Sequence, residues 1–506
     1  MLAKVASATI VGIDAVEVGV EVDISAGLPG MAVVGLPDTA VQESKERVKA
    51  AIKNTGYVFP LRKIVVNLTP ADLRKEGPSF DLPISLGVLA ATEQVQVPAD
   101  LLFLGELSLD GSLRGVSGVL PIAATARQLG KRGVVVPKDN WAEAKVVGEI
   151  AVYAFSHLGE VLQFLQDPAS YQEPIYQQPE QAVVNTPSYD LREVKGQSHA
   201  RRALEIAAAG GHNLIFVGPP GAGKTLLARC LPSILPPMTP EEALETTRIY
   251  SVAGLLQGKG LITDRPFRSP HHSASGPSLV GGGSFPRPGE ISLASNGVLF
   301  LDELTEFKRD VLDFLRQPLE DGFVTISRTK QSVVFPAKFM LVASTNPCPC
   351  GYWGDPVQPC TCSPKQREQY WARLSGPLMD RIDLQVLVTR LKPEEITSST
   401  TGEPSAVVRE RVTQARQWQQ ERFAQESSVR CNAQMQTRHL REFCQLDDRS
   451  RSLLEGAIRR LGLSARASDR VLKVARTIAD LDHSPFIQAH HVAEAIQYRT
   501  LDRFSS

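Results

Sequence analysis

The chain has 506 residues, of which 42% are hydrophobic and 22% charged, and 55 basic side chains balance 55 acidic ones. This composition is typical of a soluble globular protein with about three domains, and the zero net charge argues against a protein that is permanently coated with DNA. The sequence holds no uninterrupted apolar run of about 18 residues, and its first residues lack the layout of a cleavable signal. We therefore expect a cytoplasmic protein without a membrane partner.

Residues 1–165 alternate between strand-like and helical segments. The apolar runs 64–68 and 133–137 have the character of buried strands, and residues 42–54 and 120–128 have helical patterns. Such an alternation predicts an α/β domain. Residues 166–190 are rich in Pro and Gln and poor in aliphatic side chains, so we interpret them as a linker.

The run GPPGAGKT at 218–225 fits the phosphate-binding pattern G-x-x-x-x-G-K-[ST] at every fixed position. It follows the apolar run 214–217 and precedes the helical run 226–229, the order of strand, loop and helix that the motif requires. Backbone N–H groups of such a loop surround phosphate oxygens, the lysine reaches the β and γ phosphates, and the threonine binds Mg²⁺. The residues predicted to bind ATP here are Gly218, Pro219, Pro220, Gly221, Ala222, Gly223, Lys224 and Thr225.

A second apolar run, 297–301, has the character of a strand buried on both faces, and it ends in Asp302 and Glu303. An acidic residue at the carboxyl end of such a strand lies beside the phosphate loop in a doubly wound sheet. We therefore expect Asp302 to bind Mg²⁺ and Glu303 to polarise the attacking water. ATP would then be hydrolysed as well as bound.

A third strand is predicted at 339–344, and it ends at Thr345 and Asn346. After residue 390 Pro and Gly become rare, and helical stretches follow at 406–424, 448–461, 469–481 and 490–496. We therefore expect a P-loop core with a parallel sheet at 191–390 and a helical domain at 391–506 that packs on it. The predicted fold class is α/β with a helical C-terminal domain.

Four of the seven cysteines form two close pairs, Cys348 with Cys350 and Cys360 with Cys362. Disulfides are not expected in a cytoplasmic protein, whereas four thiolates can form a tetrahedral zinc site. The usual zinc spacing is C-x₂-C, and both pairs here are C-x-C. Two interpretations stay open at this point: a Zn²⁺ site, or reduced cysteines with a structural role.

The order of the motifs resembles the magnesium-chelatase-like branch of the AAA+ ATPases. After the phosphate loop come SPHHSAS at 269–275, PGEISLASNGVLFLDE at 288–303, STNPCPCG at 344–351 and SGPLMDRIDL at 375–384. In the N-terminal part, KEGPSFDLPISLGVL at 75–89 and GELSLDG at 105–111 resemble the C-terminal domain of Lon proteases. A Lon-like domain before a chelatase-like core and a helical tail is the arrangement of the YifB/ComM family, which the chain resembles over nearly its whole length.

This resemblance implies a homo-hexameric DNA helicase that uses ATP and Mg²⁺ and promotes branch migration in natural transformation or recombination. The first sensor position of the family matches Asn346, which would orient the attacking water. The arginine finger matches Arg381, which would reach the γ-phosphate in the neighbouring subunit. The second sensor matches Arg466 or, almost equally well, Arg470.

In the related helicases a β-hairpin points into the central channel, and residues 324–335 match it. Arg328 and Lys330 would lie at its tip, where a ring repeats them once per subunit and makes a positive channel for the DNA backbone. A solvated turn is the alternative interpretation. His271 and His272 point in different directions as adjacent residues, so we assign them a structural or channel role rather than a metal site.

Lon proteases use a Ser–Lys pair, in which the lysine activates the serine. Ser79 matches the serine, but the position of the lysine is Leu120, and Lys131 stands in a different local context. We therefore expect a degenerate Lon fold that is proteolytically inactive and is reused for assembly or partner contact.

Two other functions compete with a DNA motor. A metal-insertion ATPase of the magnesium chelatase type needs a large porphyrin-binding partner, and the Lon-like domain is foreign to it. A protein-remodelling ATPase is favoured by an aromatic or hydrophobic channel loop, whereas the hairpin tip here reads Arg328-Thr329-Lys330.

Overall fold

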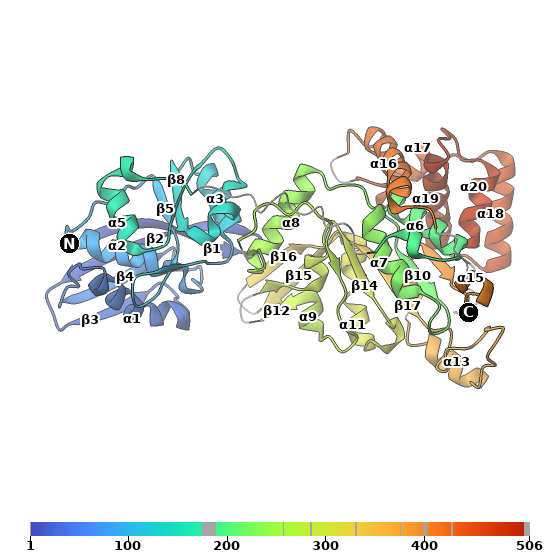
Figure 1. Cartoon of the computed structure of the whole chain (residues 1–506), viewed down its shortest axis with the longest axis horizontal. Coiled ribbons are helices and arrows are strands. Elements are labelled where there is room, and N and C mark those ends of the chain that lie inside the picture. Colours follow the sequence, from blue (N-terminus) through green and yellow to red (C-terminus); the bar gives the residue numbers. More distant parts are fainter. Residues whose placement is uncertain are drawn as a thin grey trace.

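The computed structural model describes residues 2–174, 189–256, 258–283, 286–328, 331–374, 376–397, 402–426 and 429–499. Most of the predicted linker, 175–188, and the last residues, 500–506, lie outside the described residues. Three groups of elements follow one another along the long axis (Figure 1): a seven-stranded sheet with its helices, a five-stranded sheet, and the C-terminal helices.

The N-terminal part is built on a mixed sheet with the strand order β3-β4-β2-β1-β5-β8-β9. The strands β1 and β2 form a long antiparallel pair, and the strands from β1 through β5 and β8 to β9 are parallel. Its strands are β1 Leu2–Val11, β2 Asp14–Ser25, β3 Gly30–Val34, β4 Lys63–Thr69, β5 Leu101–Phe103, β8 Gly133–Pro137 and β9 Ala151–Phe155, with a small hairpin of β6 Glu106–Leu107 and β7 Leu113–Arg114. Its helices are α1 Thr39–Asn54, α2 Asp81–Ala91, α3 Val119–Gln128, α4 Trp141–Lys145 and α5 Leu158–Gln166.

Each face of this sheet has its own core, because successive side chains of a strand point to opposite faces. In β5 and the residue after it, Leu101 and Phe103 pack with α1, α2 and α5, whereas Leu102 and Leu104 pack with α3 and α4. Tyr171, which falls in the predicted linker, packs its ring against Phe155 and Phe164 of the first core. The N-terminal part therefore has a doubly covered sheet.

The central part is built on a parallel sheet with the strand order β11-β14-β17-β10-β18. The strands are β10 Leu214–Val217, β11 Phe267–Arg268, β14 Val298–Leu301, β17 Met340–Thr345 and β18 Leu384–Leu387. The helices of this part are α6 Ser198–Gly210, α7 Lys224–Ile234, α8 Pro240–Val252, α9 Gly276–Val280, α10 Glu290–Leu293, α11 Arg309–Asp313, α12 Arg316–Asp321, α13 Pro364–Trp371 and α14 Gly376–Met379. Two hairpins project from it, β12 Gly281–Gly282 with β13 Arg287–Pro288, and β15 Phe323–Arg328 with β16 Gln331–Pro336.

The register of the central sheet brings the ends of three strands together. Val217 pairs with Thr345, and Leu301 pairs with Ala343, so β10, β14 and β17 end at one edge. Apart from Ser344 and Thr345 at the end of β17, these strands are apolar, because both faces of the sheet are covered. On one face Phe216 and Phe300 pack with α6 and α7, and on the other Val217 and Leu301 pack with α11 and the β15–β16 hairpin.

The C-terminal part is helical and shares a core with the central sheet. Val412 of α16 and Ile478 of α19 are fully buried in the same cluster as Phe216. The helices are α15 Pro393–Thr397, α16 Ser405–Arg422, α17 Thr437–Phe443, α18 Asp448–Leu461, α19 Ala465–Leu481 and α20 Ala489–Gln497. The predicted fold class, α/β with a parallel-sheet core and a C-terminal helical region, is confirmed.

The N-terminal part contacts the central part at two places. At the β1–β2 turn, Ile13 packs against the core of the central part, and a Cβ on the neighbouring Gly12 would lie 3.0 Å from Cγ1 of Val333 in the β15–β16 hairpin. At the second place, α3 lies along α8, and the Gly118 N–H donates to the Ser251 carbonyl oxygen at 3.0 Å.

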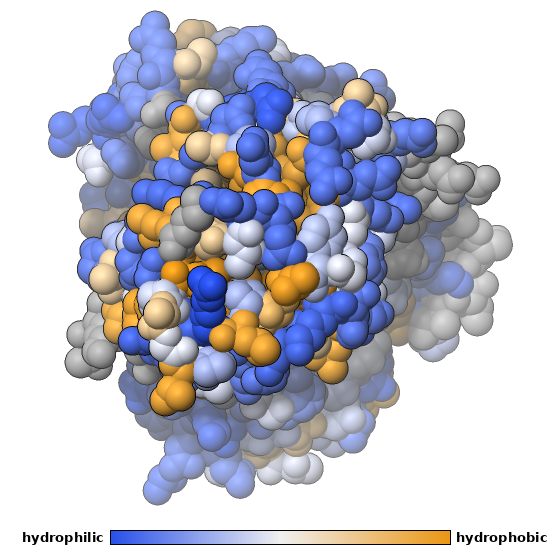
Figure 2. All heavy atoms as spheres, turned by 90° about the vertical axis from the view of Figure 1, so that its left-hand side faces the viewer, coloured by the Kyte–Doolittle hydropathy of each residue, from blue (hydrophilic) through white to orange (hydrophobic). Residues whose placement is uncertain are grey.

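The free end of the N-terminal part is a mixed surface (Figure 2). Apolar side chains gather near the middle of this face, and polar side chains surround them. Exposed large apolar residues of the N-terminal part include Leu28, Val58 and Leu61. Among the described helices, none combines the length and the apolar character that a membrane crossing requires.

Candidate functional site

The loop 218–225 joins β10 to α7 and needs glycine for steric reasons. Gly221 and Gly223 have φ angles of 76° and 89°, a region that other residues enter only with strain. A Cβ on Gly218 would lie 2.1 Å from the Val388 carbonyl oxygen of the neighbouring segment. The loop is therefore a tight turn that ends at the N-terminus of a helix, a geometry that favours anions.

Lys224 turns back over this loop and reaches the end of β17. Its Nζ donates to the Gly218 carbonyl at 2.7 Å, to the Pro219 carbonyl at 2.9 Å and to Asn346 Oδ1 at 3.2 Å. Burial lowers the pKa of Lys224, and the charges of Asp302 and Glu303 oppose that shift. Lys224 and Asn346, predicted from separate motifs, therefore share one polar cluster.

Thr225 and Asp302 also meet at this edge. Thr225 Oγ1 donates to Asp302 Oδ2 at 2.9 Å, and the Glu303 N–H donates to Asp302 Oδ1 at 3.1 Å. Ser344 Oγ donates to Asp302 Oδ1, which fixes the carboxylate between two strands. A hydroxyl and a carboxylate next to a phosphate-binding loop form a suitable set of ligands for Mg²⁺.

Sequence reasoning assigned no role to Ser344, and it gave His272 a structural or channel role without placing it near Glu303. His272 Nδ1 lies 3.7 Å from Glu303 Oε2, and both side chains are partly exposed. The signal that could have revealed this contact is strand order, because Arg268 of β11 pairs with Leu299 of β14. The SPHHSAS segment that follows β11 therefore emerges at the same edge as Glu303.

Arg381 lies at the opposite edge of the sheet. The Asn213 side chain, just before β10, donates to the Arg381 carbonyl at 3.0 Å. The guanidinium is largely buried, and it pairs with Glu320 of α12 at 2.6 Å and donates to the Pro377 carbonyl at 2.5 Å. Because β10 has four residues, about 13 Å separates this edge from the phosphate loop.

The two candidates for the second sensor lie near this arginine. Arg470 of α19 pairs with Asp383, which is almost fully buried, whereas Arg466 is exposed at the start of the same helix. Burial opposes ionisation of Asp383, but Arg470 and His212 lower its pKa. The hydrogen bond with Arg381, together with the charges of Arg466 and Arg470, lowers the pKa of Glu320. Of the three arginines, Arg381 contacts Glu320 directly, and Arg470 contacts Asp383.

The four paired cysteines come together directly after Asn346. The Sγ atom of Cys348 lies 3.3 Å from that of Cys350 and 3.7 Å from that of Cys360, and Cys350 lies 3.6 Å from Cys360. The four sulfurs, including that of Cys362, all lie within 4.8 Å of one another. All four residues are free cysteines, so this loop could hold a metal ion.

The predicted channel hairpin is present as β15 and β16, with Ser327 opposite Ser332. Arg328 ends β15, but its side chain, like the whole of Lys330, lies outside the described residues.

At the predicted Lon serine, Ser79 belongs to the 3₁₀ turn Pro78–Phe80. Leu120 is buried in α3, Lys131 pairs with Glu17 at 2.8 Å, and Lys75 Nζ donates to the Leu73 carbonyl at 2.7 Å. These lysines therefore engage groups other than the Ser79 hydroxyl.

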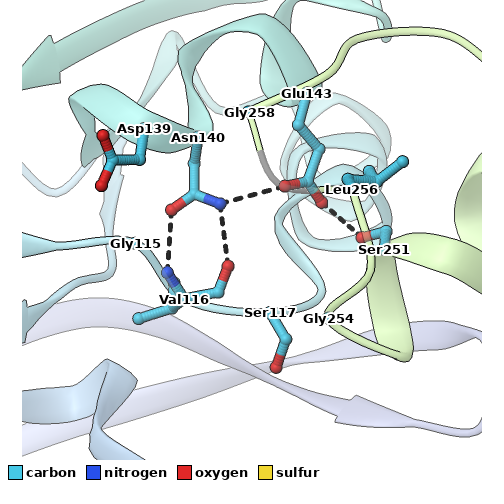
Figure 3. Close-up of a pocket in the computed structure, with 10 residues that line it drawn as sticks. All are labelled: Gly115, Val116, Ser117, Asp139, Asn140, Glu143, Ser251, Gly254, Leu256 and Gly258. Atoms are coloured by element: carbon cyan, nitrogen blue, oxygen red, sulfur yellow. Dashed lines mark hydrogen bonds between the residues drawn. The ribbon is translucent and has the colours of Figure 1, made fainter.

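A cavity of about 500 Å³ lies between the N-terminal and central parts, away from the phosphate loop. Figure 3 shows Asn140 and Glu143 on one side and Ser251 on the other. Glu143 accepts from the Leu120 N–H at 2.9 Å, from Asn140 Nδ2 at 3.0 Å and from Ser251 Oγ of α8. Burial raises the pKa of Glu143. The cavity is thus a polar joint between the two parts.

Comparisons with known proteins agree with the geometry. Three family descriptions match consecutive segments: subunit ChlI of Mg-chelatase at 20–140, magnesium chelatase subunit ChlI at 190–396, and its C-terminal region at 402–499. Escherichia coli YifB is 46% identical over 97% of this chain and 96% of its own length. The competence protein ComM of Haemophilus influenzae is 46% identical over 99% of this chain and 98% of its own.

A shorter match supports the reading of the N-terminal part. Lon protease 2 of Bacillus subtilis is 27% identical over 135 residues, which are 26% of this chain and 24% of that protein. AAA+ ATPases of the magnesium-chelatase type use ATP and Mg²⁺. The chain belongs to the YifB/ComM family of magnesium-chelatase-like AAA+ ATPases.

Proposed function

We propose that the protein is an ATP-driven, homo-hexameric DNA motor of the cytoplasm, a helicase that promotes branch migration in competence or recombination. The observation that carries the ATPase is the meeting of Lys224, Thr225, Asp302, Glu303 and Asn346 at one edge of the sheet. The printed name of the Haemophilus relative, a competence protein, supports the link to DNA uptake.

In this proposal the phosphate loop and Lys224 bind the ATP phosphates, and Thr225 and Asp302 bind Mg²⁺. Glu303 polarises the attacking water, and Asn346 orients it. Ser344 positions Asp302 through its hydroxyl, and His272 Nδ1 lies 3.7 Å from Glu303 Oε2, where it can help to orient that carboxylate. Hydrolysis then depends on positive charges held in place, which stabilise the negative charge of the transition state.

Arg381 acts in trans in this proposal, because the length of β10 separates it from the phosphate loop of its own chain. In a ring with head-to-tail interfaces, the edge that carries Arg381 faces the next subunit's nucleotide. Arg466 acts as the second sensor, and the ion pair between Arg470 and Asp383 holds α19 against the central part. The ion pair with Glu320 would then have to open for Arg381 to reach a phosphate.

DNA contacts are assigned to Arg328 and Lys330 at the tip of the β15–β16 hairpin. A ring would multiply these charges, so a neutral chain can still bind a phosphate backbone. The approach of Gly12 to Val333, together with the packing of Ile13 on the same core, supports a role for the N-terminal part in holding the hairpin.

We also propose the division into a proteolytically inactive Lon-like domain at 1–165, a linker at 166–190, an AAA+ core at 191–390 and a helical domain at 391–506. Zn²⁺ is proposed as a further ligand, at Cys348, Cys350, Cys360 and Cys362. Metal insertion and protein remodelling remain the competing functions.

One measurement separates the three functions. The ATPase rate of the full chain is measured alone and with single-stranded, forked and four-way DNA, with an unfolded protein, and with a porphyrin. We expect DNA, above all branched DNA, to raise the rate and the four-way junction to be resolved in an ATP-dependent way. A rate that responds to protein or porphyrin and not to any DNA would overturn the proposal.

A further inference from the structure

The sulfur positions in the cysteine loop match one tetrahedral metal ion. With Zn–S bonds of about 2.3 Å, the sulfurs of a tetrahedral zinc site lie about 3.8 Å apart. Three of the separations here are 3.3, 3.6 and 3.7 Å, well beyond the roughly 2.05 Å of a disulfide bond.

Backbone hydrogen bonds support the same reading. The Cys350 N–H donates to Cys362 Sγ, and the Cys362 N–H donates to Cys360 Sγ, both at 3.4 Å. The two C-x-C pairs are therefore folded onto each other by their own backbone. Such bonds stabilise negative charge on sulfur, which suits thiolates that share a cation.

The cysteine loop is joined to the nucleotide site at three points. Cys348 follows Asn346 after one residue. A Cβ on Gly351 would lie 2.7 Å from Cδ of Pro220, so the cysteine loop lies directly against the phosphate loop. At the far end of the loop, Trp371 Nε1 of α13 donates to the Pro347 carbonyl at 3.1 Å.

A buried hydroxyl network continues this connection. Thr305 Oγ1, just after the Asp302–Glu303 turn, donates to the Tyr370 hydroxyl at 2.6 Å and lies 3.1 Å from Thr345 Oγ1. Helix α13, which begins two residues after Cys362, therefore contacts the end of β17, where the Tyr370 hydroxyl lies 3.3 Å from Thr345 Oγ1, and the turn that follows Asp302 and Glu303. A change in the cysteine loop would therefore shift groups next to Asn346 and next to Glu303, which are expected to lie on either side of the γ-phosphate.

We propose that the four cysteines bind one Zn²⁺ and that this ion is a positioning element of the ATPase site, which keeps Asn346 and the Pro220 side of the phosphate loop in their productive arrangement. The inference rests on the proposed ATPase function. Binding replaces the thiol protons, which pass to solvent, and involves no change of oxidation state. The ion itself takes no part in hydrolysis.

The first test measures metal in the full chain. Protein purified without added metal is analysed by elemental mass spectrometry, and we expect about one Zn²⁺ per chain. Cys360→Ser should lose the metal, and Cys360→His, which keeps a ligand in place, should retain it. A wild-type protein that is folded and free of zinc, and that does not take up added Zn²⁺, overturns the proposal.

The second test measures whether the ion supports catalysis. Cys360→Ser should lower kcat by about tenfold or more, an effect of misplacing groups around the phosphate, while Cys360→His restores most of it. Removing zinc from the wild type with a chelator, followed by dialysis into excess Mg²⁺, should give the same loss, and added Zn²⁺ should reverse it. If zinc is bound and its removal leaves kcat unchanged in a folded protein, the positioning role is wrong.

The third test probes the contact with the phosphate loop without touching a ligand. Gly351→Ala forces a Cβ against Pro220, whereas Gly354→Ala has the same kind of positive φ, 79° against 87°, and open space around it. We expect both to keep zinc, and only Gly351→Ala to lose kcat with a changed KM for ATP. Equal kcat in the two variants would contradict the contact. Failure of DNA to stimulate the wild type would instead count against the DNA motor, because zinc content and basal hydrolysis are measured without DNA.

Discussion

Replacement of Arg381 by alanine tests whether two chains build each ATPase site. The Arg381 backbone is hydrogen-bonded to Asn213 at the start of β10, and the phosphate loop begins after the other end of that strand, about 13 Å away. An arginine that reaches a developing γ-phosphoryl charge contributes on the order of 10³-fold or more to the rate. We therefore expect Arg381→Ala to bind ATP and to hydrolyse it about 10³-fold more slowly.

Rings that contain two different variants give a quantitative form of this prediction. Arg381→Ala supplies an intact Glu303, and Glu303→Gln supplies an intact Arg381, so one interface in four is complete in a random equal mixture. If interfaces work independently, co-expressed rings should reach about a quarter of the wild-type rate, against almost none for either variant alone. The assay is steady-state ATP hydrolysis by rings that mass measurement shows to contain both chains.

Arg459→Ala is the matched control, because its side chain is 81% exposed on α18 and pairs with Glu455 of the same helix. Loss of such a surface ion pair should change the ATPase rate little. Mixed rings no more active than the separate variants would refute the trans assignment, and so would normal hydrolysis by Arg381→Ala.

The other predictions concern ATP binding, DNA binding and the joint between the two parts. Lys224→Ala removes the cation that faces the phosphates and should abolish binding of a fluorescent ATP analogue; retained affinity would contradict its role. Changing Arg328 and Lys330 together to alanine should remove DNA stimulation of the ATPase and make the salt dependence of DNA binding shallower, because fewer counterions are released; an unchanged slope would move the DNA contact elsewhere. Ser251→Ala deprives the Glu143 carboxylate of a donor and should lower the free energy of unfolding by about 1–3 kcal/mol. Burial raises the pKa of Glu143 and the Ser251 hydrogen bond opposes that shift, so the bond supports the ionised carboxylate and its loss costs most where Glu143 is ionised. The difference in urea midpoints between the variant and wild type should therefore grow with pH, and a difference that does not grow would refute this account.

Local patterns explain what could be predicted from the sequence. Continuous apolar runs identified β10, β14 and β17, and the glycine spacing identified the phosphate loop, because both depend on neighbours in sequence. Their meeting at one edge followed from parallel strand order, and the register places Asp302 and Asn346 beside the loop. The alternation of strands and helices likewise led to the confirmed α/β class.

Contacts between distant segments could not be predicted in this way. The pair of Arg381 with Glu320 joins residues 61 positions apart, 381 minus 320, and depends on how α12 packs. The approach of His272 to Glu303 depends on the short edge strand β11, which has only two residues and gives almost no apolar signal. The cysteine spacing left zinc and reduced thiols open, and only the folded loop places the four sulfurs together.

The contacts between the N-terminal and central parts give a physical reason for a Lon-like fold in which Lys75 and Lys131 engage groups other than Ser79. Ile13 packs against the core that includes the β15–β16 hairpin, whereas Glu143 is a buried acid that Ser251, Asn140 and one backbone N–H satisfy. An apolar contact is not directional, so alone it would allow several orientations of the N-terminal part. A buried carboxylate is costly in any orientation that breaks its hydrogen bonds. The combination fixes the N-terminal part in one orientation on the element that is proposed to contact DNA. A fold that positions a hairpin needs no active serine, and loss of the lysine would leave this mechanical role intact.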